Sequence, residues 1–384
     1  MARFSRRTGW DLRESSFAAA VRAARAGSPR LMDLTVSNPT VCGFQYDADG
    51  VLGPLRQIKA LSYDPDPRGM RVAREAVRGY YREHGADVSA DEVVLTTSTS
   101  EAYSFVFRLL CDAGEEVLIA RPSYPLFEFL AEIDDVRLRS YPLFYDHGWW
   151  IDFAELERAI SERTRAIVVV HPNNPTGHAT SSGERQRLEE ICARRGLALI
   201  ADEVFLDYPL REGEAIRSFA VGEHPVPTFV LSGMSKIAGL PQMKAAWVLV
   251  CGPPAEKAEA LGRMEMVADT FLSMSAPVQL AVPFWLAGRE ALRKQISERV
   301  RRNVAAIAEC GLEMLRMEAG WSAVLRLPQR SGDAVEMALL RRGAVVHPGE
   351  FYGIGERGRV VVSLIVPVEE FRAGMQIVRR YCAE

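Results

Sequence analysis

Two lysines stand close together in the segment LSGMSKIAGLPQMKAAW, residues 231–247. Lys236 follows a run of small residues, and Lys244 comes eight positions later. The chain has 47 lysine and arginine residues, of which only five are lysines, so lysine is the uncommon choice at both positions. A lysine amine, unlike a guanidinium, can lose its proton and act as a nucleophile or a base. Lys236 is therefore the first candidate for chemistry, with a solvated loop lysine as the plain alternative.

Polar residues also follow apolar stretches that have the pattern of buried strands. Ser98, Thr99 and Ser100 come after VVLTT and open a helical pattern, whose free backbone N–H groups would bind an anion. Asn174 lies in the turn HPNNPTG after AIVVV, and Asp202 comes directly after LALIA. An acid at the end of an apolar strand is costly unless it meets a cation or a donor. Taken singly, a helix cap and a tight turn explain the first two features equally well.

The order of the expected elements brings these residues together. Strands are predicted at 93–98, 116–123, 136–143, 166–172, 197–205, 228–233 and 245–252, with helices at 100–113, 152–163 and 182–195. The strands are nearly continuous apolar runs, which is typical of a parallel sheet covered by helices on both faces. Ligands of such sheets bind beyond the carboxyl ends of the strands. One edge should therefore gather an anion site, an amide, a carboxylate and two lysines.

Other segments frame this sheet. Before it we expect helices at 15–26 and 70–84 and an extended arm at 31–45. After it come a mostly helical stretch at 255–318, then strands at 321–328 and 359–367, an extended segment at 344–349, a helix at about 331–342 and a last helix ending near 381. This end of the chain is predicted to form a small α+β domain.

Pyridoxal 5′-phosphate is the cofactor that needs this set of side chains. A lysine forms the Schiff base, and a carboxylate keeps the pyridine nitrogen protonated so that the ring withdraws electrons. A helix N-terminus and a cation bind the phosphate. The sequence therefore predicts an enzyme that uses this cofactor.

Composition narrows the class of protein. Hydrophobic residues make up 48% and charged residues 25%, as in ordinary globular proteins, and a net charge of −3 gives no basic surface for nucleic acid. The six cysteines include no CxxC pair, which favours reduced thiols in a cytoplasmic protein. We expect no metal site, no secretory signal and no membrane-spanning segment.

The sequence resembles the fold-type I, class I/II aminotransferases of the aspartate aminotransferase superfamily. The motifs that carry the resemblance are YDPDPRG with AREAV (63–77), STSEA (98–102), RPSYPLF (121–127), HPNNPTG (171–177), ADEVF (201–205) and SGMSK with GLPQMK (232–244). It implies an α/β fold with a large domain, residues 46–280, around a mostly parallel seven-stranded sheet. Residues 1–45 and 281–384 would form a small α+β domain. It also implies a homodimer with shared active sites.

The resemblance assigns roles to single residues. Lys236 and Asp202 would be catalytic, as the Schiff-base lysine and the partner of the pyridine nitrogen. Asn38 and Arg359 would bind substrate. Cofactor binding would further involve Ser98, Thr99, Ser100, Tyr124, Asn174, Phe205, Ser232, Lys244 and, from the neighbouring subunit, Tyr63.

Lys244 stands where the family usually has an arginine for the phosphate. Three further departures matter. Phe205 stands where the family commonly has a tyrosine, and the glycine expected before the phosphate cation is replaced around Gln242 and Met243. The largest departure is Val361, at the position of the arginine that binds the substrate carboxylate. Arg359 shares the face of that strand, roughly 7 Å away, and is the candidate replacement.

The main hypothesis is an aminotransferase that moves an amino group between an amino acid or amine and a 2-oxo acid. Because of Val361, an alternative is another reaction of the same cofactor, such as decarboxylation, elimination, cyclisation or oxidation in specialised biosynthesis. A third hypothesis is a cofactor-sensing binding domain without turnover. Such domains are usually fused to a DNA-binding segment, and the sequence contains no basic arm.

Overall fold

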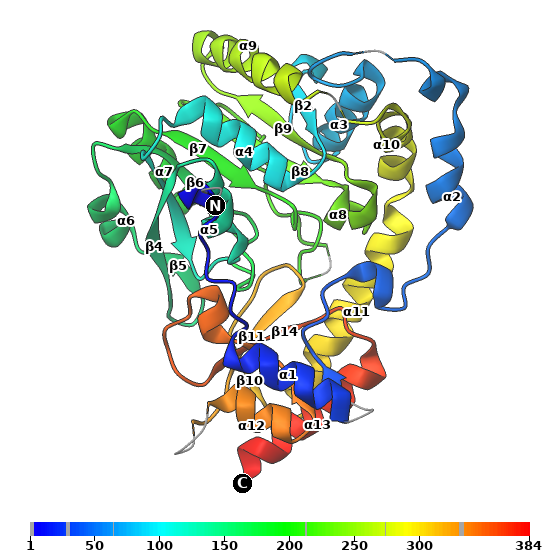
Figure 1. Cartoon of the computed structure of the whole chain (residues 1–384), viewed down its shortest axis with the longest axis vertical. Coiled ribbons are helices and arrows are strands. Elements are labelled where there is room, and N and C mark those ends of the chain that lie inside the picture. Colours follow the sequence, from blue (N-terminus) through cyan, green and yellow to red (C-terminus); the bar gives the residue numbers. More distant parts are fainter. Residues whose placement is uncertain (1–3, 28–30, 64, 212, 273, 330–333) are drawn as a thin grey trace.

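The computed structural model describes residues 4–27, 31–63, 65–211, 213–272, 274–329 and 334–384. Asp64 of the YDPDPRG motif and residues 331–333 of the helix expected at 331–342 lie outside the described residues. In the described part, an upper body built on a large sheet stands above a smaller body that contains the C-terminus (Figure 1).

Eight strands form the large sheet, in the order β2-β9-β8-β7-β6-β3-β4-β5. The four pairs from β8 to β4 are parallel, so the sheet is mostly parallel as predicted. The strands are β2 Val93–Thr96, β3 Glu116–Arg121, β4 Arg137–Tyr145, β5 Trp149–Ile151, β6 Thr164–Val170, β7 Ala198–Asp202, β8 Thr228–Gly233 and β9 Ala246–Cys251.

Two details of the sheet differ from the prediction. The count is eight strands instead of seven, because β4 continues to Tyr145 and turns back into the three-residue strand β5. β9 is antiparallel to both of its neighbours. Residues 234–245, which join it to β8, form α8 and η6 and lead back into the sheet at the end where β8 stops.

Alternate residues of each strand belong to two separate cores. Leu118 and Ala120 of β3 face one core, and Val117 and Ile119 face the other. The first core is covered by α3 Arg71–Glu83, α6 Phe153–Ala159, α7 Ser182–Arg195, α8 Met234–Ile237 and α10 Ala276–Gly288. The second is covered by α4 Thr99–Leu110, α5 Leu126–Ile133 and α9 Pro254–Phe271. Burial on both faces explains why the strands are continuous apolar runs.

The smaller body contains a four-stranded antiparallel sheet in the order β10-β11-β14-β13. Its strands are β10 Glu313–Met314, β11 Ser322–Arg326, β13 His347–Pro348 and β14 Arg359–Ser363. Helices α11 Glu290–Glu309, α12 Val335–Arg341 and α13 Val368–Ala383 accompany it. The expected helical stretch therefore ends at Glu309, and residues 310–318 contain β10 and turns.

Both ends of the chain meet in this body. Strand β1 Met32–Asp33 pairs in parallel with β12 Ala344–Val345, and the blue helix α1 Ser16–Gly27 lies beside the orange α12 (Figure 1). The chain then passes through the short helix α2 Ala48–Leu52 to α3. Helix α10 spans the expected domain boundary at 280–281, and the division into domains stays a prediction.

Short 3-10 helices complete the described chain. They are η1 Arg6–Thr8, η2 Pro39–Val41, η3 Gly53–Arg56, η4 Ile58–Leu61, η5 Ala90–Glu92, η6 Pro241–Met243 and η7 Gly349–Tyr352. Two of them, η6 and η7, end beside the cavity described next.

Candidate active site

A cavity of about 770 Å³ opens beyond the carboxyl ends of β6, β7 and β8. Residues of the small sheet and of the N-terminal arm also line it, so the site depends on how these parts come together. The predicted residues that line it are Asn38, Ser98, Thr99, Ser100, Tyr124, Asn174, Asp202, Phe205, Lys236 and Lys244. The sequence patterns therefore located about half of the lining residues that the larger body contributes.

Asp202 ends β7 and is only 6% exposed. Its Oδ1 accepts the backbone N–H of Val204 at 3.1 Å, and its Oδ2 accepts the hydroxyl of Tyr103 at 3.0 Å. Burial raises the pKa of Asp202 to about 6, against the opposing effect of these hydrogen bonds and of Lys236. The carboxylate is thus fixed in position and lacks water that would stabilise its charge.

Lys236 lies in the short helix α8, directly after β8. Burial lowers the pKa of its amine to about 8, and the nearby Asp202 carboxylate limits the decrease. Its Nζ is 5.0 Å from the ring centre of Trp321 and 5.6 Å from that of Phe205. The backbone is held by the hydroxyl of Tyr208, which donates to the carbonyl oxygen of Lys236 at 2.7 Å. About a tenth of this amine is therefore unprotonated at pH 7, and about half at pH 8.

The anion-binding end of the cavity combines a helix start with a cation. Ser98 caps α4, and its Oγ accepts the N–H of Glu101 at 3.1 Å. Lys244 lines the same cavity with φ of 51°, a left-handed conformation that is uncommon for a residue with a side chain. Gly233 allows a close approach here, because a Cβ on it would lie 2.8 Å from the Cβ of Ala246. A phosphate would meet N–H groups, hydroxyls and one ammonium at this end.

Asn174 and Tyr124 approach the cavity from two loops. The Oδ1 of Asn174 accepts the hydroxyl of Ser322 at 3.1 Å, which leaves its amide N–H₂ for another partner. Tyr124 is 45% exposed, and its ring forms part of the cavity wall. Phe205 is buried and packs edge-on against Trp321 at a ring distance of 5.5 Å. These rings give the cavity apolar walls around its charged groups.

Three predicted residues do not line the cavity. The Ser232 hydroxyl is fully buried and donates to the backbone carbonyl of Glu203 at 3.4 Å. Arg359 lies opposite Arg326 on the small sheet, near Glu313 and Glu356. Tyr63 is 76% exposed on the surface of this chain.

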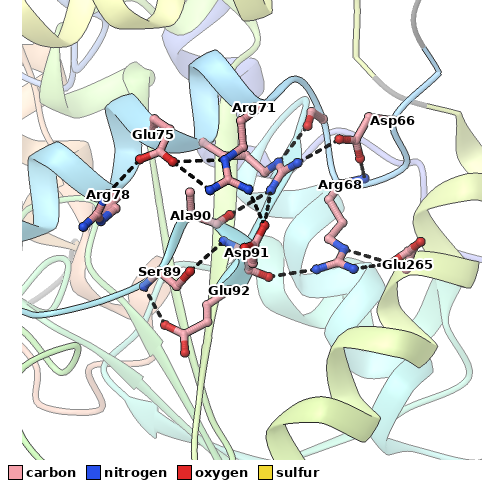
Figure 2. Close-up of polar contacts among 12 residues, drawn as sticks. Asp66, Arg68, Arg71, Glu75, Arg78, Ser89, Ala90, Asp91, Glu92 and Glu265 are labelled. Atoms are coloured by element: carbon pink, nitrogen blue, oxygen red, sulfur yellow. Dashed lines mark hydrogen bonds and ion pairs between the residues drawn. The ribbon is translucent and has the colours of Figure 1, made fainter.

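Residues 66–69 are held by a buried arginine. Figure 2 shows the polar network around Asp66, Arg68 and Asp91. At its centre Arg74 is 6% exposed and donates to Gly69 O at 2.8 Å, Ala90 O at 3.0 Å and Asp66 Oδ2 at 2.8 Å. Asp66, Gly69 and η5 are thereby fastened to α3.

Sequence reasoning missed several residues of the cavity. Tyr103, Trp321, Ser322, His347 and Tyr352 line it but come from a helix interior or from the small body. For Tyr103 a signal existed, because a residue four positions after Thr99 lies on the same face of a helix. For the other four, only the packing of the two bodies brings them to the site.

The residues present fit pyridoxal 5′-phosphate. The buried Asp202 could hold a proton on a ring nitrogen, Lys236 could bond to the aldehyde carbon, and the start of α4 with Lys244 could bind the phosphate. Among the described residues, no group of three or more His, Cys, Asp or Glu side chains could hold a metal ion. No helix in the described ranges is both long and apolar enough to cross a membrane.

Comparison with known proteins agrees with this geometry. Residues 56–370 match the profile of the family "Aminotransferase class I and II". A glutamate-pyruvate aminotransferase of Haemophilus influenzae is 26% identical over 75% of this chain and 71% of its own length. An alanine aminotransferase of Mycobacterium tuberculosis is 29% identical over 68% of this chain and 62% of its own length. The solved alanine aminotransferase of Pyrococcus furiosus superposes with a TM-score of 0.87 and 22% identity, over 99% of this chain and 100% of that one.

Proposed function

Because the chain belongs to the class I and II aminotransferase family, we propose that the residues of its cavity hold pyridoxal 5′-phosphate for amino-group transfer. The protein is a pyridoxal-phosphate-dependent aminotransferase of fold type I, and its substrates are amino and oxo acids. The observation that carries the proposal is that the buried Asp202 and the partly buried Lys236 line one cavity, each with a shifted pKa.

Lys236 is the residue that would attach the cofactor and move the proton. Its amine, with a pKa lowered to about 8, can bond to the aldehyde carbon. When bound, the cofactor supplies a pyridine ring that stabilises negative charge at the substrate Cα. Once released by the incoming amine, Lys236 Nζ would take the proton from the substrate Cα. It would then give this proton to the cofactor carbon that carried the aldehyde oxygen.

Other polar groups of the cavity would orient the cofactor ring and stabilise its charge. Asp202, held by Tyr103 and the N–H of Val204, would keep the proton on the ring nitrogen. Asn174, fixed by Ser322, would donate to the ring hydroxyl oxygen. Phe205 has no hydroxyl, so that oxygen would have one donor fewer than a tyrosine here would give.

The phosphate and the ring face would be held by the other predicted residues. The N–H groups and hydroxyls of Ser98, Thr99 and Ser100, with the Lys244 ammonium, would bind the phosphate. The ring of Tyr124 would stack on the pyridine.

The relatives' names suggest which substrates to test first. We propose glutamate or alanine as the amino donor and pyruvate or 2-oxoglutarate as the acceptor. The purified protein loaded with cofactor should transfer ¹⁵N from labelled glutamate to pyruvate, detected by mass spectrometry as labelled alanine. Lys236→Ala should lose this transfer. If a product with a lost carboxyl or a cleaved side chain forms without labelled alanine, the alternative chemistry of the same cofactor is correct.

We also propose a homodimer. Ile58, Leu61 and Tyr63 are between 76% and 83% exposed in a single chain, and apolar surface of this kind is normally covered. Tyr63 would then contact the cofactor phosphate in the neighbouring subunit. Sedimentation would test the assembly, and Tyr63→Phe would test the contact through weaker cofactor binding. We further propose that the protein acts in the cytoplasm and that its chain divides into the two domains predicted above.

A further inference from the structure

The cavity has few groups that could bind a carboxylate. Among the described residues that line it, none is an arginine, and its two lysines are the proposed cofactor ligands Lys236 and Lys244. An aminotransferase nevertheless binds the carboxylates of an amino acid and of an oxo acid in turn. A carboxylate that leaves water needs other donors in their place.

The small sheet brings one such group to the cavity. Val361 of β14 is 2% exposed and packs in the same core as Tyr352. The residue opposite Val361 on β13 is His347, which lines the cavity. Directly opposed residues of an antiparallel pair have their side chains on the same face. Where β14 gives an apolar side chain, β13 therefore gives a polar one beside it.

His347 and Tyr352 form a hydrogen-bonded pair. The Nδ1 of His347 lies 2.8 Å from the Oη of Tyr352, and both residues line the cavity. Burial lowers the pKa of His347 and raises that of Tyr352, so the imidazole is neutral and the phenol keeps its proton. Phe351 packs against both rings, at centroid distances of 5.3 Å and 5.2 Å.

This pair has a hydrogen-bond donor to spare. If the phenol donates to Nδ1, the imidazole carries its proton on Nε2, and no described residue accepts from that atom. If Nδ1 instead donates to the phenol oxygen, the Tyr352 hydroxyl proton has no described acceptor. In either tautomer one donor is left for a ligand.

Two arginines of α1 lie near the cavity and are already paired. Arg22 and Arg25 line an adjoining hollow of about 420 Å³, which meets the cavity at Thr35 and His347. Arg22 forms an ion pair with Glu14 and Arg25 with Asp33. Both guanidinium groups therefore have carboxylate partners without any substrate.

We propose that the pair of His347 and Tyr352 binds the carboxylate of the amino-acid and oxo-acid substrates. This inference rests on the proposed function, because it assumes substrates with a carboxylate in this cavity. A neutral donor stabilises a carboxylate less than a bidentate guanidinium does. The enzyme should therefore discriminate only modestly between an amino acid and the amine that lacks its carboxyl group.

The test compares His347→Phe and Tyr352→Phe with Tyr145→Phe in the cofactor-loaded enzyme. Tyr145 lies outside the cavity, where its hydroxyl accepts the N–H of Arg316 at 3.1 Å. The probe is propanoate, which has a carboxylate but neither an amino nor an oxo group, and its binding is measured by calorimetry. Both variants of the pair should bind propanoate about tenfold more weakly, since a hydrogen bond to a charged group is lost. Tyr145→Phe should bind it like the wild type.

A kinetic comparison separates binding from a general loss of structure. In the variants, kcat/KM for alanine should fall about tenfold, while kcat/KM for ethylamine should not change. If His347→Phe does not fold, Tyr352→Phe, which removes a single oxygen, decides the matter.

The inference is overturned if Tyr352→Phe binds propanoate within twofold of the wild type, or if the wild type binds none. A tenfold loss in Arg25→Met, without a loss in the pair variants, would assign the carboxylate to that arginine. Failure of the proposed function would appear separately, as absence of ¹⁵N transfer by the wild-type enzyme.

Discussion

Replacing Asp202 by asparagine should stabilise the cofactor-free protein and disable the enzyme. Burial raises the pKa of Asp202 from 3.8 to about 6. The pKa of this carboxyl is thus about 2 higher in the folded than in the unfolded protein. When the carboxyl is ionised, this difference lowers the free energy of unfolding by about 3 kcal/mol. Because the folded-state pKa is the higher one, this group favours the folded state below about pH 4, and the contribution is lost as the pH rises through 6.

The expected gain in Asp202→Asn is therefore about 1–3 kcal/mol at pH 7.5 and close to zero below pH 4. The lower part of this range allows for Lys236, whose amine loses its charged partner and whose pKa then falls further below 8. The assay is urea unfolding of the cofactor-free protein at both pH values. The same substitution should weaken cofactor binding at least tenfold and reduce kcat about 100-fold, because it removes the charge beside the ring nitrogen.

Glu203→Gln is the matched control. Glu203 is the next residue, is 1% exposed, and burial also raises its pKa to about 7, yet it does not line the cavity. It accepts the Ser218 hydroxyl at 2.7 Å on the far side of the strand end. Cofactor affinity should stay within about twofold in this variant. The reasoning fails if both variants weaken cofactor binding equally, or if Asp202→Asn leaves transamination intact.

Three further outcomes are expected. Lys236→Ala should lose the visible absorbance of the cofactor on dialysis. In the wild type the rate of cofactor attachment should rise from pH 7 to 9 and then level off, because the amine pKa is about 8. Retained absorbance in the variant, or a wild-type rate that still rises at pH 10, would contradict the role of Lys236. Lys244→Gln should raise the cofactor dissociation constant about 10- to 100-fold in equilibrium dialysis, as one charge-assisted hydrogen bond is lost, and an unchanged constant would remove Lys244 from the phosphate site. Arg74→Met should lower the free energy of unfolding by about 3 kcal/mol, because the buried carbonyls of Gly69 and Ala90 lose their donor; an unchanged urea midpoint would show that the network in Figure 2 adds no stability.

The sheet could be predicted because its strands carry a strong signal. Residues 166–170 and 198–202 are apolar at every position but one, and only a strand buried on both faces needs that. The direction of β9 could not be predicted from its composition, because its apolar run is like those of the parallel strands. Strand β5 was not predicted, because a three-residue segment with a tryptophan on each face resembles a loop as much as a strand.

The residues of the candidate site also fall into those that the sequence could locate and those that it could not. Asp202, Asn174 and Lys236 could be located because each lies at the carboxyl end of a strand or in the turn after it, and the ends of adjacent parallel strands are close in space. His347 and Tyr352 could not, because they reach the cavity only when the small sheet packs beside the large one. Their sequence, AVVHPGEFY, has the composition of ordinary core and turn.

The buried pair itself argues that this cavity was kept for chemistry. Burial acts against the charged form of both partners: it raises the pKa of Asp202 and lowers that of Lys236. Their mutual attraction offsets only part of this cost, and apolar residues of similar size at both positions would often give an equal or more stable fold. The same shifts would be useful once a ring nitrogen and an aldehyde are present, since a protonated nitrogen would give Asp202 a charged donor and the partly neutral amine is ready to react. Stability in the cofactor-free protein and reactivity in the loaded one therefore make opposite demands on these two residues, and the sequence has kept the reactive pair.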